Sequence, residues 1–141
     1  MIEPPPVPSV GTQKPAGTDD PDLNPPDLNP LDLGFLLGLL VGEGSFGGDG
    51  RQPQITLRMH VRHRDLFHRL VVLLPASKLY GPYTHGGRHY YQWMVRGQPL
   101  RRHVAPLIAR HAALLDEYTR GRFWDMCARY DVAVEDPKRD F

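Results

Sequence analysis

The feature that most constrains the fold is an apolar stretch from Leu31 to Glu43, LDLGFLLGLLVGE. Asn29 is a preferred N-cap residue and Pro30 is favoured at the first helical position, so a helix is expected to begin there. Glycines flank Glu43 and are expected to end it. Gly38 and Gly42 are four residues apart and share one face of this helix, where the lack of side chains lets another helix approach. The stretch is too short to span a bilayer, so we expect a packing helix and no membrane partner.

Charge is distributed unevenly along the 141 residues, although the formal net charge is only +1. Residues 1–50 hold eight acidic residues and a single lysine, whereas residues 51–130 hold fourteen basic and four acidic residues. All seven histidines lie between His60 and His111. A middle segment this basic indicates a polyanionic partner, most often nucleic acid.

Cysteine usage and the first residues give an expectation for the compartment. Cys127 is the single cysteine, so the chain cannot form an intramolecular disulfide or a cysteine-based zinc site. The first residues have no basic and apolar signal pattern, and their acidity argues against a mitochondrial transit peptide. We expect a soluble protein of the cytoplasm, associated with the nucleoid of a prokaryote or phage-infected cell, with an organelle not excluded.

Proline content divides the chain into three parts. Nine of the 15 prolines lie in the first thirty residues, so residues 1–29 are expected to form a disordered, acidic, proline-rich arm. The arm ends in PDLNPPDLNP (21–30), a pentapeptide repeated twice, which is typical of a linker and leaves a docking peptide as the alternative. Residues 30–130 form the expected folded domain, and residues 131–141 a charged C-terminal tail.

The periodicity of the middle segment predicts an α+β fold. Alternating apolar residues predict a strand over 54–61, paired with a short strand over 45–48, and helical spacing predicts a helix over 65–74 that ends at Pro75. Two aromatic-rich strands, 78–83 and 89–96, are joined by a Gly86-Gly87 turn. A helix opened by Pro99 and a last helix over 114–130, with Phe123, Trp124 and Cys127 buried, complete the order αββαββα.

The segment LLGLLVGEGSF (36–46) resembles the core motif of the LAGLIDADG homing endonuclease family. The consensus lines up without gaps on Leu36–Gly44, and the common Ser-Phe continuation follows at Ser45-Phe46. The resemblance extends over about residues 31–130, because PQITLRMHV is similar to the family's second strand and KLYGPYTHGGRHYYQWMV to its second hairpin. It implies a homing-endonuclease-like αββαββα fold with an antiparallel DNA-binding sheet.

The resemblance also implies a metal site at the end of the first helix. In the family, two such helices pack through their small residues, and the acid at the end of each binds a divalent metal beside the scissile phosphate. Glu43, with the adjacent Gly42, is then the metal-binding position, and Mg²⁺ (or Mn²⁺) is the expected cofactor because it prefers oxygen ligands. An acid at a helix C-terminus opposes the helix dipole, so Glu43 calls for a functional reason.

A single motif implies that the second helix comes from another subunit, and hence a homodimer. The expected dimer contacts are Leu37, Gly38, Val41 and Gly42. By resemblance, His63 takes the position that helps to place the attacking water. The family's lysine near the start of the final helix is missing, and Arg120 is the expected cationic substitute, with Arg122 second.

The polar faces of the predicted strands are expected to contact DNA. Arginine reaches phosphates and guanine edges, while Thr and Gln contact base edges in the major groove. The expected DNA-binding residues are Gln54, Thr56, Arg58, His60 and Arg62 from the first long strand, and Lys78, Tyr80, Tyr90, Gln92 and Arg96 from the hairpin.

Together these features predict a homing-type endonuclease that makes metal-dependent double-strand breaks in a roughly palindromic DNA site. Two departures from the family, the missing lysine and the short connection between Gly44 and Gln54, would be expected of a non-catalytic DNA-binding regulator on the same fold, which is the first alternative. The resemblance implies a second alternative, an RNA-binding maturase, because some family members have that role.

Overall fold

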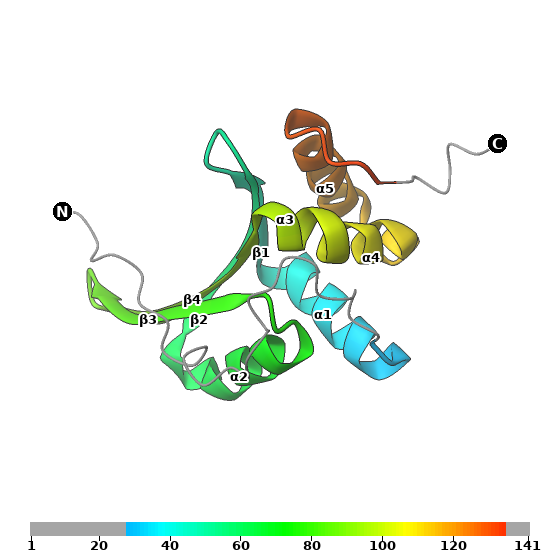
Figure 1. Cartoon of the computed structure of the whole chain (residues 1–141). Helices are drawn as coiled ribbons and strands as arrows, with labels where there is room; N and C mark the ends of the chain where they lie inside the picture. Colours follow the sequence, from blue (N-terminus) through cyan, green and yellow to red (C-terminus); the bar gives the residue numbers. More distant parts are fainter. Residues whose placement is uncertain (1–27, 135–141) are drawn as a thin grey trace.

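The computed structural model describes residues 28–134 and follows the predicted order of elements (Figure 1). The expected arm over 1–29 lies outside the described residues except for Leu28 and Asn29, and the expected tail over 131–141 is described only as far as residue 134. The elements are α1 (Pro30–Glu43), β1 (Gly44–Gly48), β2 (Pro53–His60), η2 (Val61–His63), α2 (Arg64–Leu73), β3 (Lys78–His85), β4 (Arg88–Arg96), α3 (Gly97–Pro99), η3 (Leu100–Val104), α4 (Ala105–Arg110), η4 (Ala112–Leu114) and α5 (Glu117–Arg129).

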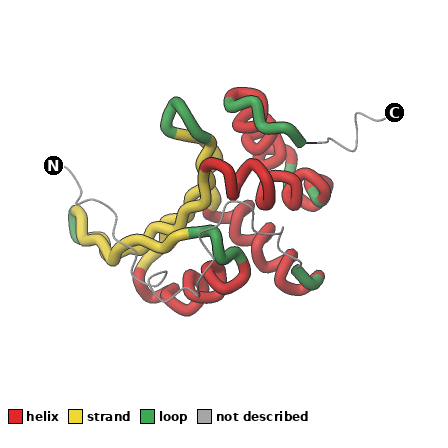
Figure 2. Tube along the Cα trace, viewed as in Figure 1, coloured by secondary structure: helices red, strands yellow, loops and turns green. Residues whose placement is uncertain are grey.

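The four strands form one antiparallel sheet in the order β1-β2-β4-β3. The helices lie together on one side of this curved sheet, as Figure 2 shows, and no helix of the described residues covers the other side. We call the free side the outer face. The alternation predicted for β2 is confirmed, because Ile55 and Leu57 are buried and pair with buried Val95 and Trp93 on β4.

The core lies between the sheet and the helices. Its largest fully buried side chains include Trp93 from β4, Phe67 from α2 and Phe123 from α5. Leu36 and Leu40 of α1 are also buried, so α1 packs against the sheet through one side only. Within the described range, none of the helices is both long enough and apolar enough to cross a membrane.

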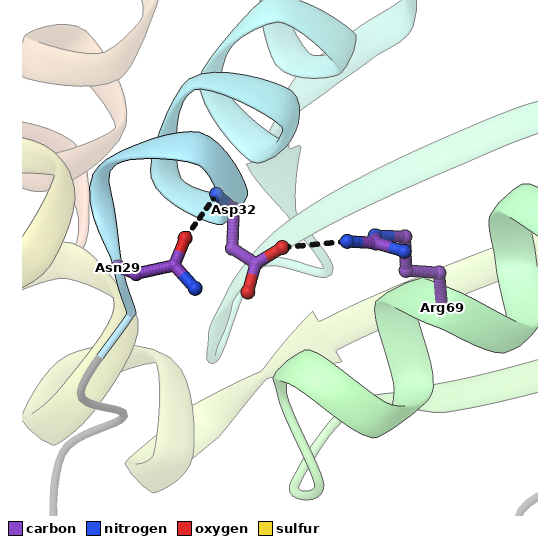
Figure 3. A network of polar contacts seen from close by, with 3 residues as sticks. All are labelled: Asn29, Asp32 and Arg69. Atoms are coloured by element: carbon purple, nitrogen blue, oxygen red, sulfur yellow. Dashed lines mark hydrogen bonds and ion pairs between the residues drawn. The ribbon is translucent and has the colours of Figure 1, made fainter.

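The predicted start of α1 is confirmed in detail (Figure 3). The Asn29 side chain accepts a hydrogen bond from the Asp32 backbone N–H at 2.8 Å, as an N-cap residue should. Asp32 in turn forms an ion pair with Arg69 of α2, at 2.8 Å between Oδ1 and the guanidinium. The first turn of α1 is therefore fixed both to its own cap and to the neighbouring helix.

The cap gives a first stability prediction. Replacing Asn29 with Ala removes the acceptor for the Asp32 N–H, so we expect the free energy of unfolding to fall by about 1 kcal/mol. Denaturant unfolding of Asn29→Ala and Asn29→Ser checks this, because Ser retains a capping oxygen and should recover most of the loss. Equal destabilisation by both substitutions would show that the cap is not the cause.

Four details differ from the sequence predictions. Leu37, expected at the dimer contact, is 3% exposed and belongs to the core. β2 ends at His60 because the His60 Nδ1 accepts from the Arg62 N–H at 3.0 Å and turns the chain into η2, so Arg62 lies outside the strand. The last helix begins at Glu117 because residues 112–114 form a separate turn. Trp124 is only partly buried, since it packs on the edge of the core beside Phe123.

The second hairpin also differs from its predicted form. β3 extends to His85, and its register against β4 shifts between Tyr80 and Tyr83. Gly81 has a φ of +105° and Pro82 has no backbone N–H, so this pair interrupts the ladder as a bulge does. The predicted turn is confirmed, because Gly86 and Gly87 both have positive φ values.

Candidate nucleic-acid interface and carboxylate site

The outer face gathers nearly all the residues predicted to bind DNA. Cross-strand partners share a face of a sheet, and the observed register places nine of the ten predicted side chains together. They are Gln54, Thr56, Arg58 and His60 on β2, Tyr90, Gln92 and Arg96 on β4, and Lys78 and Tyr80 on β3. The tenth, Arg62, lies next to this face in η2.

Arg58 lies at the centre of the outer face and is held in place by its neighbours. Its Nε donates to the Gln92 Oε1 at 2.7 Å, and its guanidinium lies 6.0 Å from the centre of the Tyr90 ring. Arg58 remains exposed, and its terminal nitrogens bond to no other described residue. A guanidinium fixed through Nε still presents two donors that suit a phosphate or a guanine edge.

The sequence prediction missed five side chains of the outer face: Ser45, Tyr83, His85, Arg88 and Met94. The register shift at Gly81-Pro82 moves Tyr83 opposite Tyr90, where the two rings lie 5.5 Å apart. It then places His85 opposite Arg88 at the tip of the hairpin. A Gly-Pro pair inside a strand pattern is the sequence signal that would have indicated the shift.

A cationic cavity of about 490 Å³ lies at this end of the outer face. Arg58 and His60 contribute to it from β2, and His85, Arg88 and His89 contribute from the second hairpin. The pKa of His60 is lowered by partial desolvation first, and then by the positive charges of Arg62, His89 and His63. The lowered pKa favours the neutral imidazole, and the His60 Nδ1 accepts from both the backbone N–H and the Nε of Arg62.

This lowered pKa gives a pH prediction for DNA binding. A phosphate near His60 favours the imidazolium and raises its pKa, so DNA binding should take up a proton and tighten as the pH falls from about 8 to about 6. A one-unit rise corresponds to at most about a tenfold gain in affinity per histidine. Binding measured by fluorescence anisotropy at constant ionic strength should lose part of this pH dependence in His60→Gln.

His111 provides the matched control, because it lies at the end of α4 on the helical side of the sheet. His111→Gln should keep the pH dependence of the wild type. An identical pH profile for wild type and His60→Gln would exclude His60 from the interface.

Glu43 ends α1 where the chain passes directly into the sheet. Gly44 both caps the helix, through its N–H to the Leu40 carbonyl, and begins β1 opposite Leu57. A Cβ at Gly44 would lie 2.6 Å from the Leu40 oxygen, so only glycine allows this close connection. The Glu43 side chain is exposed and forms no hydrogen bond or ion pair with the described residues.

The face of α1 that does not meet the core is apolar and rich in glycine. Leu31 is 78% exposed and Val41 is 41% exposed, and a Cβ added at Gly34, Gly38 or Gly42 would meet no atom within 4 Å. We call this side, with Gly38, Val41 and Gly42 at its centre, the free face of α1. Three of the four predicted dimer residues lie on it, and Leu37 does not.

Of the two candidate arginines, Arg122 is the one that borders the end of α1. The Arg120 guanidinium donates to the Leu115 carbonyl at 2.8 Å and is committed to the start of α5. Arg122 lines a small cavity of about 190 Å³ together with Val41, Gly44 and Ser45, which border the end of α1. His63 is exposed at the end of η2 and forms no hydrogen bond or ion pair with Glu43.

Glu43 can supply one ligand to a metal ion, but the described residues do not supply a full set of ligands around it. Among residues 28–134, no three His, Cys, Asp or Glu side chains gather into a group that could hold a metal ion. Mg²⁺ in nucleic-acid enzymes needs only one or two carboxylates, and phosphate oxygens and water supply the rest. A free, exposed carboxylate next to a sheet face that carries arginine and lysine side chains is compatible with that arrangement.

Comparison with known proteins finds similarity at the level of structure alone. No family model matches the chain, and no curated protein matches its sequence. The group I intron-encoded homing endonuclease I-CeuI, solved with DNA, has a TM-score of 0.61 at 15% identity, over 74% of this chain and 56% of that one. The LAGLIDADG homing endonuclease I-LtrWI, bound to target DNA, has a TM-score of 0.59 at 16% identity, over 74% and 38%.

The homing endonuclease I-TnaI matches with a TM-score of 0.57 at 18% identity, over 72% of this chain and 71% of that one. The chain thus spans little more than half of I-CeuI and about two fifths of I-LtrWI. The fold is that of the homing endonucleases. More particularly, it is the LAGLIDADG fold, so the resemblance seen in the sequence is confirmed at the level of the fold.

Proposed function

We propose that this protein is a homing-type endonuclease that binds double-stranded DNA on the outer face and cleaves it as a homodimer with Mg²⁺ or Mn²⁺. The observation that carries the proposal is the placement of Glu43. Its free carboxylate ends α1 at the point where β1 starts, beside a sheet face made of basic, aromatic and amide side chains.

DNA binding rests on the composition and shape of the outer face. Lys78, Arg58 and Arg96 supply positive charge across three strands, while Thr56, Gln54 and Gln92 supply neutral donors and acceptors. No helix of the described part covers this face, and its curvature suits a cylindrical partner (Figure 2). Charged groups position a duplex through its phosphates, and neutral polar groups read its base edges.

The homodimer rests on the free face of α1. A chain with a single motif helix supplies a single Glu43, and a two-fold contact through Gly38 and Gly42 would bring a second Glu43 to the same place. The metal held there would supply charge stabilisation to the attacking and leaving oxygens of a phosphodiester hydrolysis. Each Glu43 would supply one carboxylate ligand to the metal at one strand of the duplex. Arg122 would lie nearby, where its positive charge could interact with the phosphate.

The test of the interface is the salt dependence of DNA binding. Each phosphate contact contributes a slope of about −0.9 to the plot of log affinity against log salt. Arg58→Ala in a homodimer removes two symmetric contacts, so we expect weaker binding at low salt and a slope reduced by about 2. Arg110→Ala is the control, because Arg110 is exposed at the end of α4, away from the outer face.

Affinity that barely changes between about 50 and 200 mM salt would contradict phosphate-dominated binding. Equal losses in Arg58→Ala and Arg110→Ala would place the interface elsewhere.

A non-catalytic DNA-binding regulator is the second candidate, and one observation favours it. Arg120, the expected substitute for the family's lysine, is committed to the Leu115 carbonyl. Such a regulator would use the same outer face and the same salt dependence. It would bind DNA and leave both strands intact with any divalent metal.

A further inference from the structure

A second cavity of the outer face, of about 280 Å³, lies at the end of the sheet opposite to the tip of the second hairpin. By the register of the sheet, four of its lining side chains belong to the outer face: Lys78 and Tyr80 on β3, and Met94 and Arg96 on β4. Gln52, from the turn that joins β1 to β2, also lines it. The cavity therefore combines predicted DNA contacts with a turn that the sequence prediction did not assign to DNA binding.

The turn over residues 49–52 projects from the end of the sheet (Figure 1) and is held by its own hydrogen bonds. The Asp49 Oδ1 accepts from the backbone N–H groups of Arg51 and Gln52, each at 2.8 Å. These bonds, that from Gln52 first, lower the pKa of the Asp49 carboxyl, and the positive charge of Arg96 lowers it to a smaller extent. The Asp49 carboxylate is thus already bonded to the backbone of the turn, and Arg96 lies near it.

A second hold on the turn comes from the end of α5, 80 residues further along the chain. The Gly50 N–H donates to the Tyr130 hydroxyl at 3.0 Å, and a Cβ at Gly48 would collide with the Tyr130 ring. Tyr130 is itself buried, and its carbonyl accepts from the Arg101 guanidinium at 2.9 Å. Because the hydroxyl belongs to a buried ring, it fixes the turn to the helical layer.

Gln52 connects this fixed turn to the cavity. A Cβ at Gly97 would lie 3.1 Å from the Gln52 Oε1, so the Gln52 side chain lies against the start of α3. Lys78 and Arg96 bring positive charge to other walls of the same cavity. Two cations and an amide donor suit a phosphate. A water molecule takes up about 30 Å³, so the cavity has room for a phosphate group together with water.

We propose that this cavity binds a phosphate group of the DNA backbone and that Tyr130 is a positioning residue for that contact. Lys78 and Arg96 bind the phosphate, and the Gln52 amide donates to it. Tyr130 acts through the turn, since its ring is buried and its hydroxyl accepts from Gly50. The inference rests on the proposed function, because it takes duplex DNA as the partner.

The hold on the turn is tested first, without DNA. Tyr130→Phe keeps the ring and removes the hydroxyl, so ¹⁵N relaxation should show increased motion of residues 50–52, and the Gly50 amide should exchange faster with solvent. Tyr91→Phe is the matched control, because it removes a hydroxyl from the buried side of β4 and should leave the turn rigid. A turn that stays equally rigid in Tyr130→Phe would overturn the positioning role.

Replacement of single phosphates by neutral methylphosphonate tests the contact itself, on a duplex selected by binding from a randomised library. One phosphate position in each half-site should weaken binding of the wild type when replaced, and should lose this effect in Lys78→Ala. In Tyr130→Phe, replacing that phosphate should cost about two- to tenfold less affinity than in the wild type, which is the range for one lost hydrogen bond. The other phosphates should keep their effects, and Tyr91→Phe should match the wild type at every position.

Equal changes at every phosphate in Tyr130→Phe would show that this substitution acts on the whole fold, and would overturn the proposal. A duplex in which no phosphate couples to Lys78 would also overturn it. With binding that still falls as salt rises, both results leave the proposed function standing. Binding that does not depend on salt would contradict the proposed function itself, and this inference with it.

Discussion

Replacing Glu43 with Gln should reduce DNA cleavage by at least about 100-fold and leave DNA binding intact. The substitution keeps the shape of the side chain and removes the charge that would hold a divalent metal. Metal-ion stabilisation is worth several kcal/mol, and about 1.4 kcal/mol corresponds to a factor of ten in rate. Plasmid nicking and linearisation measure cleavage, and anisotropy in Ca²⁺ or without metal measures binding.

Stability provides an internal check on Glu43→Gln. Glu43 lies at the negative end of α1, so removing its charge should leave the melting temperature unchanged or raise it slightly. Asp125→Asn, an exposed acid on α5, is the control and should cleave as the wild type does. Equal cleavage by wild type and Glu43→Gln would falsify the assignment of this carboxylate as a metal ligand.

Replacing Gly38 with Leu should abolish the homodimer, and cleavage with it, while the single chain still folds. No atom lies within 4 Å of a Cβ at Gly38, so the chain itself accepts the larger side chain. Two α1 helices that meet through their glycines have no room for it. Light scattering over a range of concentrations should show a dimer for the wild type and a monomer for Gly38→Leu.

Gly121→Leu is the control for dimerisation, because Gly121 is exposed on α5 and a Cβ there also meets no atom within 4 Å. It should remain dimeric. A dimeric Gly38→Leu, or a wild type that stays monomeric with and without DNA, would remove the model of a shared active site.

Local sequence signals predicted the fold well wherever one physical cause dominates. Asn29 followed by Pro30 fixed the start of α1 through capping chemistry, and the structure shows the predicted hydrogen bond. Strict alternation in β2 placed Ile55 and Leu57 in the core, because a strand with one buried face admits no other arrangement. Gly86-Gly87 predicted the hairpin turn for the same kind of local reason.

The errors arose where the local sequence pattern fits two placements of a side chain equally well and tertiary contacts decide between them. α1 is apolar almost all the way round, so its pattern does not say which face meets the core, and Leu37 was placed on the wrong side. The Gly81-Pro82 interruption shifts one strand by a residue and so moved Tyr83 and His85 onto the outer face unexpectedly. The role of Arg120 stays a prediction: Arg120 and Arg122 contact different groups, and residue spacing alone does not reveal those contacts.

The free face of α1 and the outer face meet at Glu43, and this gives the proposed function its geometry. α1 passes into β1 with no intervening linker, so a two-fold contact on the helix also fixes how the two sheets present themselves to DNA. The proposed site is therefore incomplete in one chain. Dimerisation and cleavage should be lost together in every variant of the free face.

Metal-dependent cleavage of both strands can be measured by incubating the wild-type protein with a plasmid library of randomised sites, with Mg²⁺ or with EDTA, and sequencing the ends. We expect linear products with Mg²⁺ alone, cut on both strands within a site of approximate two-fold symmetry. DNA that is bound in a salt-dependent manner but left intact with Mg²⁺ and with Mn²⁺ would contradict this expectation.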